Sequence, residues 1–426
     1  MTACTSRFQK IDGKLAEHIV TRFGSPVYIM DESGIRARLA EIRQQTRSVY
    51  ANSVVAVPYK TSTIHGLLAL LHRDGAWAEV VSGDEYRVAR ALGVPDERII
   101  FNGPMKTDQQ LAEAMLSGAQ INCDHAGEVD RLEDIARAHN TVARVGIRLS
   151  FPDVRGWNRF GFSVRGGNAG GAADISGRIF ASRHLELQGV HAQIGTNIRD
   201  LSRFTVMAEK MAAFAVHLQK THGIELKYIN VGGGLAGISP RIDEAGPGPW
   251  PLPGVKAYAR AVISPLLPYL KGLSREATLI FEPGRTLFEP FGAMLTTVIG
   301  LRPAGPDGIP GVILDAGRSN LVLASEYAHP IHVCGRTRPE RRQRLFGPTC
   351  MERDVLHSPS VLPVLKRNDR LVIYGCGGYS MSRAGSFIRF RSGVLLWRDN
   401  GDMLWLREPE TLSHQKMLEH IPEERQ

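Results

Sequence analysis

The sequence predicts a (β/α)8 barrel followed by an all-β domain. Up to about residue 290, short apolar segments alternate with amphipathic segments of helical period, such as residues 108–116 and 126–139. After that point, strand-like segments are joined by turn-rich connections, of which residues 303–310 are an example. The 426 residues are enough for two domains that each bury a core.

Eight apolar segments are predicted to form the barrel, because eight strand-helix units close such a fold. They are residues 53–57, 78–81, 98–101, 119–123, 143–149, 187–194, 226–231 and 277–281. In the β domain we expect strands at residues 293–301, 311–314, 370–374 and 393–397. The Gly-rich residues 166–171 and the Pro-rich residues 246–254 are predicted to be surface excursions from the barrel.

The composition excludes several classes of protein. A hydrophobic content of 43% with 22% charged residues is ordinary for a globular chain. The net charge is +9, but Lys and Arg are scattered, and the one dense cluster, residues 336–344, contains no aromatic residues. We therefore interpret the charge as a solvated surface with a weak preference for anionic ligands, and expect no nucleic-acid partner.

The cysteines and the absence of long apolar runs predict a cytoplasmic protein. Five cysteines are an odd number without CxxC spacing, which favours neither a zinc site nor a disulfide framework. They are Cys4, Cys123, Cys334, Cys350 and Cys376. Residues 1–14 lack the apolar core of a signal peptide, and no run approaches the roughly 20 apolar residues of a membrane span. We expect no metal and no membrane partner.

Three consecutive glycines, Gly232, Gly233 and Gly234, follow the apolar residues 228–231. Without Cβ atoms, a backbone can adopt positive φ and surround a phosphate with its N–H groups. A lone triplet is equally compatible with a tight turn between a strand and a helix that binds nothing. The neighbouring chemical groups therefore decide the interpretation.

Lys60 ends an apolar segment at the mouth of the first predicted barrel strand, and Glu282 and Arg285 follow the eighth. Each alone is more typical of an exposed lysine or a structural ion pair. A partly desolvated lysine, however, is a nucleophile toward aldehydes, a carboxylate can hold a ring nitrogen protonated, and an arginine can bind phosphate or carboxylate. Because barrel strands present such groups at one end, the combination predicts a pyridoxal-phosphate site.

Many short motifs also lie in a familiar order between about residues 25 and 390. They are Pro26-Val27-Tyr28, Lys60, residues 79–85 (EVVSGDE), residues 101–106 (FNGPMK), Arg148, residues 159–162 (RFGF), residues 232–235 (GGGL), residues 282–285 (EPGR), residues 315–317 (DAG), residues 347–350 (GPTC) and residues 377–379 (GGY). In these residues the chain resembles the fold type III pyridoxal-phosphate decarboxylases. This group has the alanine-racemase-like barrel and contains diaminopimelate, ornithine and arginine decarboxylases.

The resemblance implies roles for individual residues. Lys60 would carry the cofactor, pyridoxal 5'-phosphate, and Glu282 would pair with its ring nitrogen. Cys350 would reach in from the partner subunit of a homodimer with shared active sites, as the proton donor to the decarboxylated carbon. Racemases of this fold place an arginine near the ring nitrogen, so the carboxylate of Glu282 favours decarboxylation. The other cofactor contacts would be Arg148, Thr196, Gly232, Gly233, Gly234, Gly284, Arg285 and Tyr379.

The resemblance also implies the domain boundaries. Residues 35–290 would form the cofactor-binding barrel. Residues 1–34 and 291–426 would form the β domain, which contributes to the active site of the dimer.

The segments that would contact the substrate depart from the family pattern. Diaminopimelate decarboxylases carry an arginine for the distal carboxylate where simple alignment puts Leu323, although Tyr327 keeps the aromatic residue. Ornithine decarboxylases use acids for the distal amine, but Ala328 and Met351 stand there. Glu352 or Arg353 could substitute if the loop shifts by a residue. The expected substrate contacts are Arg285, Tyr327, Met351 and Glu352.

A second departure concerns the face of the cofactor ring. Gln193 stands where many family members place a histidine that stacks on the ring. His191, two residues earlier, faces the same side of the strand. It either takes the role of that histidine or is a satisfied core residue.

These departures resemble the branch of the family that works in siderophore and antibiotic pathways. The leading hypothesis from sequence is decarboxylation of a modified or carrier-conjugated L-amino acid in specialised metabolism. The alternative is diaminopimelate decarboxylation in lysine synthesis. A third hypothesis, a catalytically silent regulator, is disfavoured because Lys60, Glu282 and Cys350 are all present.

Overall fold

The computed structural model describes residues 7–154, 159–165, 170–245, 250–335 and 337–420. The chain divides into two compact units. The barrel unit comprises Arg36–Ala236 and Pro251–Leu287, and the β unit comprises Met1–Ile35, Gly237–Trp250 and Phe288–Gln426. Residues 237–245 and Trp250 thus group with the β unit, although Trp250 was expected to lie in an excursion from the barrel.

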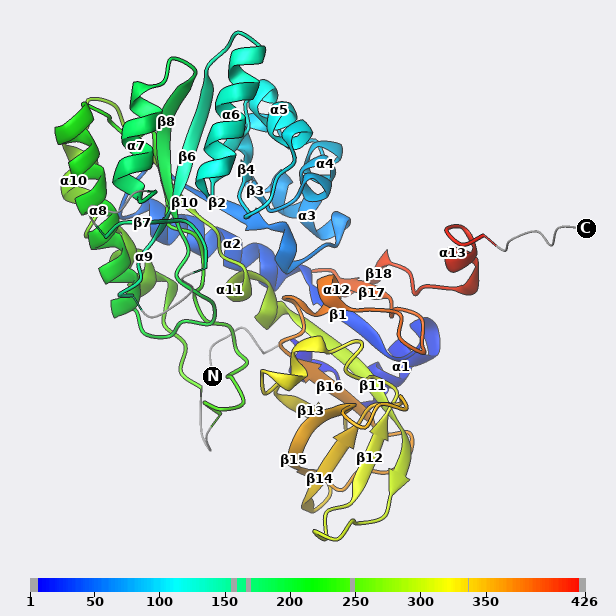
Figure 1. Cartoon of the computed structure of the whole chain (residues 1–426). Helices are drawn as coiled ribbons and strands as arrows, with labels where there is room; N and C mark the ends of the chain where they lie inside the picture. The colour runs from blue at the N-terminus through cyan, green and yellow to red at the C-terminus, as the bar shows by residue number, and fades with distance from the viewer. Residues whose placement is uncertain (1–6, 155–158, 166–169, 246–249, 336, 421–426) are drawn as a thin grey trace, which may run out of the picture. The chain divides into compact units, whose positions relative to one another are not determined.

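Eight parallel strands close into the barrel (Figure 1). Their order is β5-β4-β3-β2-β10-β9-β8-β6, and pairing of β5 with β6 completes the ring. The strands are β2 (Ser53–Pro58), β3 (Trp77–Val80), β4 (Ile99–Phe101), β5 (Gln120–Cys123), β6 (Ala143–Ser150), β8 (Leu185–Ala192), β9 (Tyr228–Asn230) and β10 (Thr278–Phe281). The short β7 (Phe162–Ser163) pairs with β6 outside the ring. The predicted fold class, a (β/α)8 barrel with a separate β domain, is confirmed.

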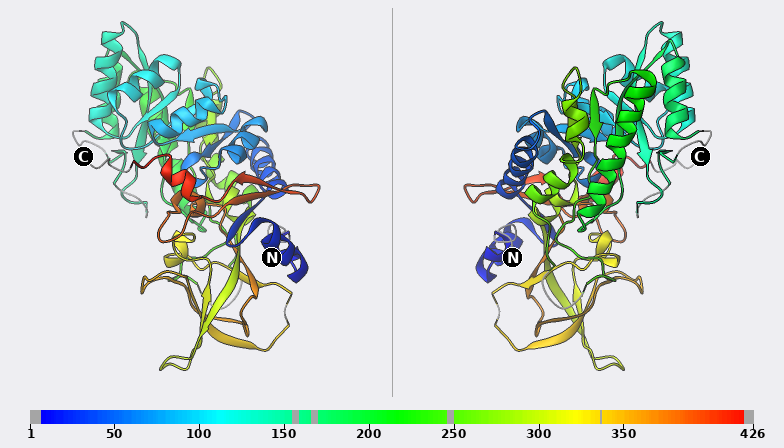
Figure 2. Two further views of the ribbon diagram at one scale, coloured as in Figure 1. Left: turned by 90° about the vertical axis from the view of Figure 1, so that its right-hand side faces the viewer. Right: turned by 90° about the vertical axis from the view of Figure 1, so that its left-hand side faces the viewer.

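Helices cover the outside of the barrel strands (Figures 1 and 2). Local sequence sets their ends. At α5, the Thr107 side chain and Gln110 form a capping box, and Gly118 ends the helix in the left-handed conformation with φ of 87°. The helices are α2 (Glu32–Arg47), α3 (His65–Arg73), α4 (Gly83–Ala91), α5 (Asp108–Ser117), α6 (Ala126–Ala138), α7 (Ala172–Ala181), α8 (Ser202–His222), α9 (Val255–Ile263), α10 (Leu267–Lys271) and α11 (Arg285–Phe288).

The β unit contains a sheet in which the first strand of the chain occupies an interior position. The main path of the sheet runs β15-β14-β12-β11-β1-β17-β18, and β16 pairs with β11 and β13. β1 pairs antiparallel with β11 and parallel with β17. The strands are β1 (Val27–Asp31), β11 (Gly292–Arg302), β12 (Gly311–Leu314), β13 (Ile331–Val333), β14 (Glu340–Phe346), β15 (Val355–Pro363), β16 (Arg370–Tyr374), β17 (Val394–Trp397) and β18 (Met403–Arg407). The helices of this unit are α1 (Gly13–Phe23), α12 (Ser380–Arg383) and α13 (Leu412–Lys416).

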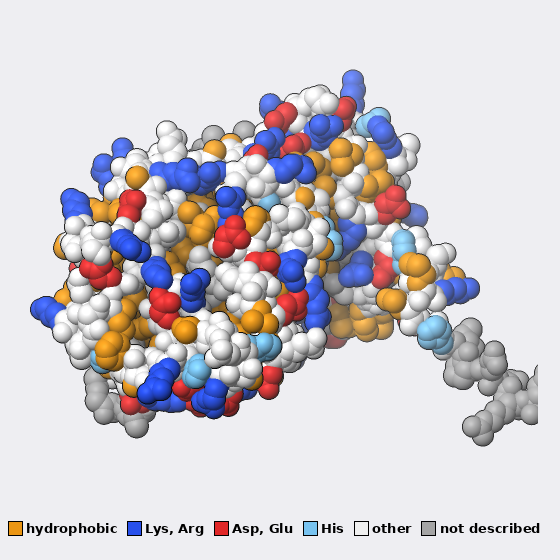
Figure 3. All heavy atoms as spheres, turned by 90° about the horizontal axis from the view of Figure 1, so that it is seen from above, with side chains coloured by type: hydrophobic (Ala, Val, Ile, Leu, Met, Phe, Trp, Pro, Cys, Tyr) orange, Lys and Arg blue, Asp and Glu red, His pale blue; other side chains and the backbone are white. Residues whose placement is uncertain are grey.

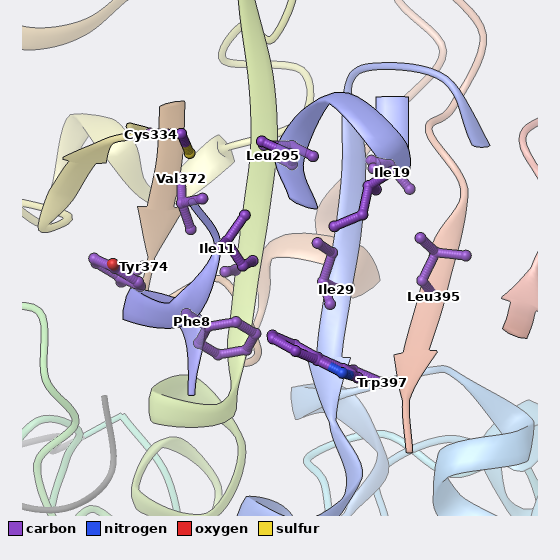
Figure 4. Close-up of a cluster of buried hydrophobic side chains, with 13 residues drawn as sticks. Phe8, Ile11, Ile19, Ile29, Leu295, Cys334, Val372, Tyr374, Leu395 and Trp397 are labelled. Carbon is purple, nitrogen blue, oxygen red and sulfur yellow. The ribbon is translucent and has the colours of Figure 1, made fainter. Parts of the chain in front are cut away.

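An apolar cluster joins the N-terminal segment to strands β11 and β17 within the β unit (Figure 4). Phe8 and Ile19 come from the N-terminal segment, Leu295 from β11, and Leu395 and Trp397 from β17. Phe8 and Ile19 are almost completely buried. Burial of such side chains is the main favourable term in folding, so this cluster fixes the N-terminal residues to the sheet.

The structure also contains strands that the sequence pattern did not predict. Residues 340–346 form β14, although they belong to the basic cluster that was interpreted as solvated surface. The side chains of Glu340, Arg341 and Arg342 are exposed, so the strand lacks the apolar alternation by which half-buried strands are detected. Parts of three predicted segments, residues 166–169, residues 246–249 and residue 336, lie outside the described residues.

Basic and acidic side chains are interspersed on the face of the molecule seen in Figure 3. Among the residues that the structure describes, there is no helix with the length and apolar character of a membrane span. Four cysteines, Cys123, Cys334, Cys350 and Cys376, are free thiols, and Cys4 lies outside the described part of the chain.

Candidate active site

The carboxyl ends of the barrel strands bring together polar side chains that are far apart in the sequence. Lys60 lies in the 3-10 turn Tyr59–Thr61 that follows β2, and Glu79 lies in β3. Asn102 follows β4, and Glu282 follows β10. Because the strands are parallel, these side chains meet at one rim of the barrel, where the sequence places the candidate site.

Lys60 forms a hydrogen-bonded ion pair with Glu79. The Glu79 side chain is fully buried, whereas 37% of the Lys60 side chain is exposed. Asn102 donates through Nδ2 to the other oxygen of Glu79, Oε1, at 3.1 Å. Lys60 is therefore oriented by a buried carboxylate and remains accessible to a ligand; it must give up a proton before its amine can act as a nucleophile.

Glu282 is buried and accepts two amide hydrogen bonds on one oxygen. Asn230 Nδ2 lies 2.6 Å and Asn102 Nδ2 lies 2.8 Å from Oε1. Burial raises the pKa of Glu282 to about 7, and Glu79 contributes in the same direction, whereas Lys60 and the two amides lower it. The second oxygen, Oε2, lies 3.7 Å from His191 Nε2.

The glycine triplet follows β9 and continues as an irregular loop. The next helix, α9, begins only at Val255, so the alternative of a tight turn between strand and helix is wrong. Gly232 and Gly234 have φ of 63° and 106°, and a β-carbon on Gly233 would overlap the backbone carbonyl of Glu282. This backbone therefore requires glycine.

Two of the three backbone N–H groups of the triplet donate hydrogen bonds to side chains. Gly232 donates to Asn230 Oδ1 at 2.9 Å, and Gly233 donates to Gln193 Oε1 at 3.1 Å. Gln193 also donates to the carbonyl of Gly195 at 3.2 Å. Gln193 thus supports the glycine loop. This is its role at the position where many family members place the ring-stacking histidine.

Two arginines lie at the same rim. Arg285 donates through Nε to Thr196 Oγ1 at 3.1 Å, which joins the loops after β10 and β8. Arg148 is buried in β6 and donates to Asp124 at 3.2 Å. A β-carbon on Gly284 would lie 2.7 Å from Thr61 Oγ1, so the loop after β10 also packs against the turn that carries Lys60.

His191 is not a satisfied core residue. It is buried in β8, and neither ring nitrogen has a hydrogen-bond partner. Burial, Arg148, Lys60 and Lys106 all lower the pKa of His191 well below its usual value, so the ring is neutral. The buried hydroxyls of Thr61 and Ser62, next to Lys60, also lack partners.

These features fit pyridoxal phosphate. The rim supplies an accessible lysine, a buried carboxylate, a glycine loop packed against that carboxylate, and the buried hydroxyls of Thr61 and Ser62 without partners. Buried polar groups without partners are costly, and a polar ligand at the rim would relieve that cost for the groups it reached.

The model of the pyridoxal binding domain of pyridoxal-dependent decarboxylases matches residues 34–289. The chain belongs to this family. It is therefore a pyridoxal-phosphate-dependent carboxy-lyase that acts on amino acids, as the sequence predicted. The relatives named below are decarboxylases, which disfavours the hypothesis of a silent regulator.

Curated relatives of this decarboxylase span almost its entire length. The diaminopimelate decarboxylase of Methanocaldococcus jannaschii is 29% identical over 420 residues, which cover 94% of this chain and 92% of the relative. The diaminopimelate decarboxylase of Aquifex aeolicus is 27% identical over 418 residues, which cover 95% and 94%. A crystal structure of the M. jannaschii enzyme in complex with L-lysine superposes with a TM-score of 0.84 at 26% identity, covering 96% of this chain and 94% of that one.

These relatives correct the order of the hypotheses drawn from sequence. The departures at Leu323 and Met351 placed the chain with the siderophore and antibiotic branch. The relatives are instead diaminopimelate decarboxylases, so the comparisons favour the alternative over the leading hypothesis.

The β unit of the decarboxylase carries the remaining predicted residues. Cys350 is exposed in a loop that Asp354 organises by accepting hydrogen bonds from Thr349 N and Oγ1 and from Arg318 N. Tyr379 has φ of 63° and precedes α12. Leu323 and Tyr327 are buried, and Met351 and Glu352 are exposed.

Sequence reasoning missed the buried partners of the predicted residues. Glu79 and Asn102 were noted only as parts of motifs, and Asn230 was not singled out. The available signal was position: each is a polar residue at the end of an otherwise apolar barrel strand, where unpaired polar groups are expensive.

Proposed function

We propose that this decarboxylase acts on an amino acid of the diaminopimelate type. The observation that carries the proposal is the similarity to the diaminopimelate decarboxylases of A. aeolicus and M. jannaschii over more than nine-tenths of each chain. Loss of CO2 from such a substrate would yield an amino acid with one carboxylate fewer, and a proton must replace CO2 on the α-carbon.

Pyridoxal phosphate, when bound, supplies a sink for the electron pair that remains on the α-carbon when CO2 departs. Lys60 provides the amine that attaches it, and Glu282 keeps its ring nitrogen protonated. Glu79 holds the Lys60 side chain at the rim, beside the place where the cofactor would bind. The phosphate contacts would come from Thr196, Gly234, Gly284 and Arg285. Gly232 and Gly233 would shape the loop around the phosphate, because their N–H groups already donate to Asn230 and Gln193.

Cys350 completes the reaction in this proposal. In a homodimer, Cys350 of the partner subunit donates its thiol proton to the α-carbon, and the resulting thiolate regains a proton from solvent. The exposure of Cys350 supports a role at an interface, because a thiol that must reach another subunit cannot be packed inside its own. Arg285 and Tyr327 remain candidates for substrate contact, together with Met351 and Glu352.

A second candidate substrate is an amino acid whose distal end carries no free charge. Leu323 stands where an arginine would bind the distal carboxylate, and it is only 3% exposed. Met351, which follows Cys350, is apolar and 40% exposed. Two apolar side chains at the places that read the distal charge would suit an acylated or carrier-linked amino acid better than free diaminopimelate.

Release of CO2 by the purified holoenzyme distinguishes the two candidates. The proposal expects turnover of meso-diaminopimelate at least tenfold faster, by kcat/KM, than of lysine, ornithine or an N-acylated diamino acid, a ratio that corresponds to about 1.4 kcal/mol. Faster turnover of a conjugated amino acid would establish the second candidate. Absence of CO2 from every amino acid tested, free or conjugated, would contradict both.

A further inference from the structure

A continuous chain of side-chain hydrogen bonds crosses the interior of the barrel. Tyr228 Oη lies 2.8 Å from Asn122 Oδ1, Asn122 Nδ2 lies 2.8 Å from Asn102 Oδ1, and Asn102 Nδ2 lies 2.8 Å from Glu282 Oε1. All four side chains are buried. They belong to or follow β9, β5, β4 and β10. In the ring, β4 is next to β5 and β9 is next to β10, so these hydrogen bonds join two neighbouring pairs that lie on opposite sides of the barrel.

Chemistry fixes the direction of this chain. An ionised carboxylate only accepts hydrogen bonds, so Asn102 must turn its amide nitrogen toward Glu282. Its oxygen then faces Asn122, which must in turn present its own nitrogen to Asn102. The Asn122 oxygen is left for Tyr228, whose hydroxyl donates. Burial raises the pKa of Tyr228, which keeps that hydroxyl protonated.

A second amide reaches the same carboxylate oxygen from the glycine loop. Asn230 donates to Glu282 Oε1 at 2.6 Å and accepts from Gly232 N at 2.9 Å. Oε1 therefore accepts from two amides. Oε2 has His191 Nε2 at 3.7 Å, which is beyond hydrogen-bond distance, and that nitrogen has no partner. Oε2 is thus the oxygen that remains for an incoming donor.

We propose that Asn102 and Asn230 are positioning residues that keep Glu282 ionised and direct its Oε2 toward the ring nitrogen of pyridoxal phosphate. Tyr228 and Asn122 set the orientation of Asn102 within this arrangement. The inference deepens the proposed function and rests on the role assigned there to Glu282.

The surroundings of Glu282 explain why such support is needed. Burial and the carboxylate of Glu79 both favour the protonated acid, whereas Lys60 and the two amides favour the anion. The other ionisable groups that face it are Arg148, His191, Tyr228 and Tyr258. A glutamic acid that has taken up a proton cannot stabilise a protonated ring nitrogen, so removal of either amide should reach the cofactor through Glu282.

The holoenzyme loaded with 15N-labelled pyridoxal phosphate provides the test, because the 15N resonance reports the protonation of the ring nitrogen directly. We expect Asn102→Ala and Asn230→Ala to move this resonance toward the unprotonated position and to lower kcat about 10- to 100-fold, as loss of a hydrogen bond to a charged group does. Tyr228→Phe should lower kcat only about threefold, since it removes the distant donor alone. Tyr269→Phe is the matched control, because this buried hydroxyl binds Leu226 N and lies outside the chain of hydrogen bonds; it should change neither quantity.

A double-mutant cycle with Glu282→Gln separates positioning from general damage to the fold. If the amides act through Glu282, Asn230→Ala should cost little further activity in the Glu282→Gln background; Asn102 is unsuited to this cycle because it also donates to Glu79. Equal losses in both backgrounds, or an unchanged 15N resonance in the single variants, would overturn the inference while leaving the role of Glu282 intact. If an alanine variant does not retain cofactor, the comparison of Tyr228→Phe with Tyr269→Phe decides.

A different result would contradict the role proposed for Glu282 itself. If Glu282→Gln leaves the ring nitrogen protonated and kcat unchanged, Glu282 does not hold the ring nitrogen, and the positioning role falls with it. None of these spectra depends on which amino acid is the substrate.

Discussion

Gly233 packs so closely against Glu282 that a β-carbon on residue 233 would overlap the backbone carbonyl oxygen of Glu282. The backbone N–H of Glu282 also donates to the carbonyl of Gly232 at 2.8 Å. The glycine loop and the buried carboxylate are therefore held together by the main chain, and a change in one must move the other.

Gly233→Ala tests this contact. Because the overlapping atom is backbone, the loop must shift, and we expect the affinity for pyridoxal phosphate to fall about tenfold or more. Equilibrium dialysis of the cofactor measures the loss. Gly254→Ala is the matched control, since nothing lies within 4 Å of a β-carbon there. Equal affinity of the two variants would show that the triplet does not shape the cofactor site.

Attachment of the cofactor can be tested at Lys60. Borohydride reduction of the holoenzyme, digestion and mass spectrometry should find the label on the peptide that contains Lys60. Lys60→Arg keeps the positive charge opposite Glu79 but has no primary amine, so it should lose the label and at least about a thousandfold in kcat. A label on the buried Lys106 would contradict the assignment.

Shared active sites predict complementation between inactive variants. Lys60→Ala and Cys350→Ala homodimers should each be nearly inactive, because each lacks one essential group in both sites. A randomly assembled mixture should recover about a quarter of the wild-type activity, since heterodimers contain one intact site. Activity that remains at the sum of the two variants would show that Cys350 acts within its own subunit or not at all.

Stability should depend on pH through Glu85. Burial raises the pKa of Glu85 to about 7, and Glu79 adds to this effect, whereas the Val81 N–H and Lys60 oppose it. Between about pH 4 and 7 the folded protein therefore binds more protons at this site than the unfolded chain, and the free energy of unfolding falls as pH rises. Burial also raises the pKa of Glu282, so part of the pH dependence of the free energy of unfolding should remain when Glu85 is replaced.

Glu85→Gln should remove the contribution of this carboxyl group. Urea unfolding at pH 5 should give similar stabilities for the wild type and the variant, because the carboxyl group is then largely protonated. At pH 8 the variant should be more stable by about 2 kcal/mol. Parallel pH curves for the two proteins would refute the assignment.

Apolar periodicity predicted the barrel because its strands are continuously buried. The predicted segment 53–57 differs from β2 by one residue, whereas 187–194 extends past the end of β8, since Ile194 is apolar but lies in the following loop. The exposed, arginine-rich β14 was missed, because a strand whose first residues face solvent carries no apolar pattern.

The site was predictable only in part. Lys60 and Glu282 were found because their chemistry is distinctive at strand ends. Their partners were not, because Asn102 and Glu282 are 180 residues apart in sequence and meet only when the ring closes. His191 shows the same limit: its lack of partners follows from the packing of β8 against its neighbours, which no local pattern reveals.

The interior position of β1 has a consequence for the order of folding. All five residues of Val27–Asp31 are buried, yet the partner strands β11 and β17 are synthesised long after β1 leaves the ribosome. The residues from Arg36 to Ala236 emerge in the meantime. For most of translation, β1 is therefore a strand without the partners that bury it in the folded sheet, so its final pairing can form only after β11 and β17 have been made.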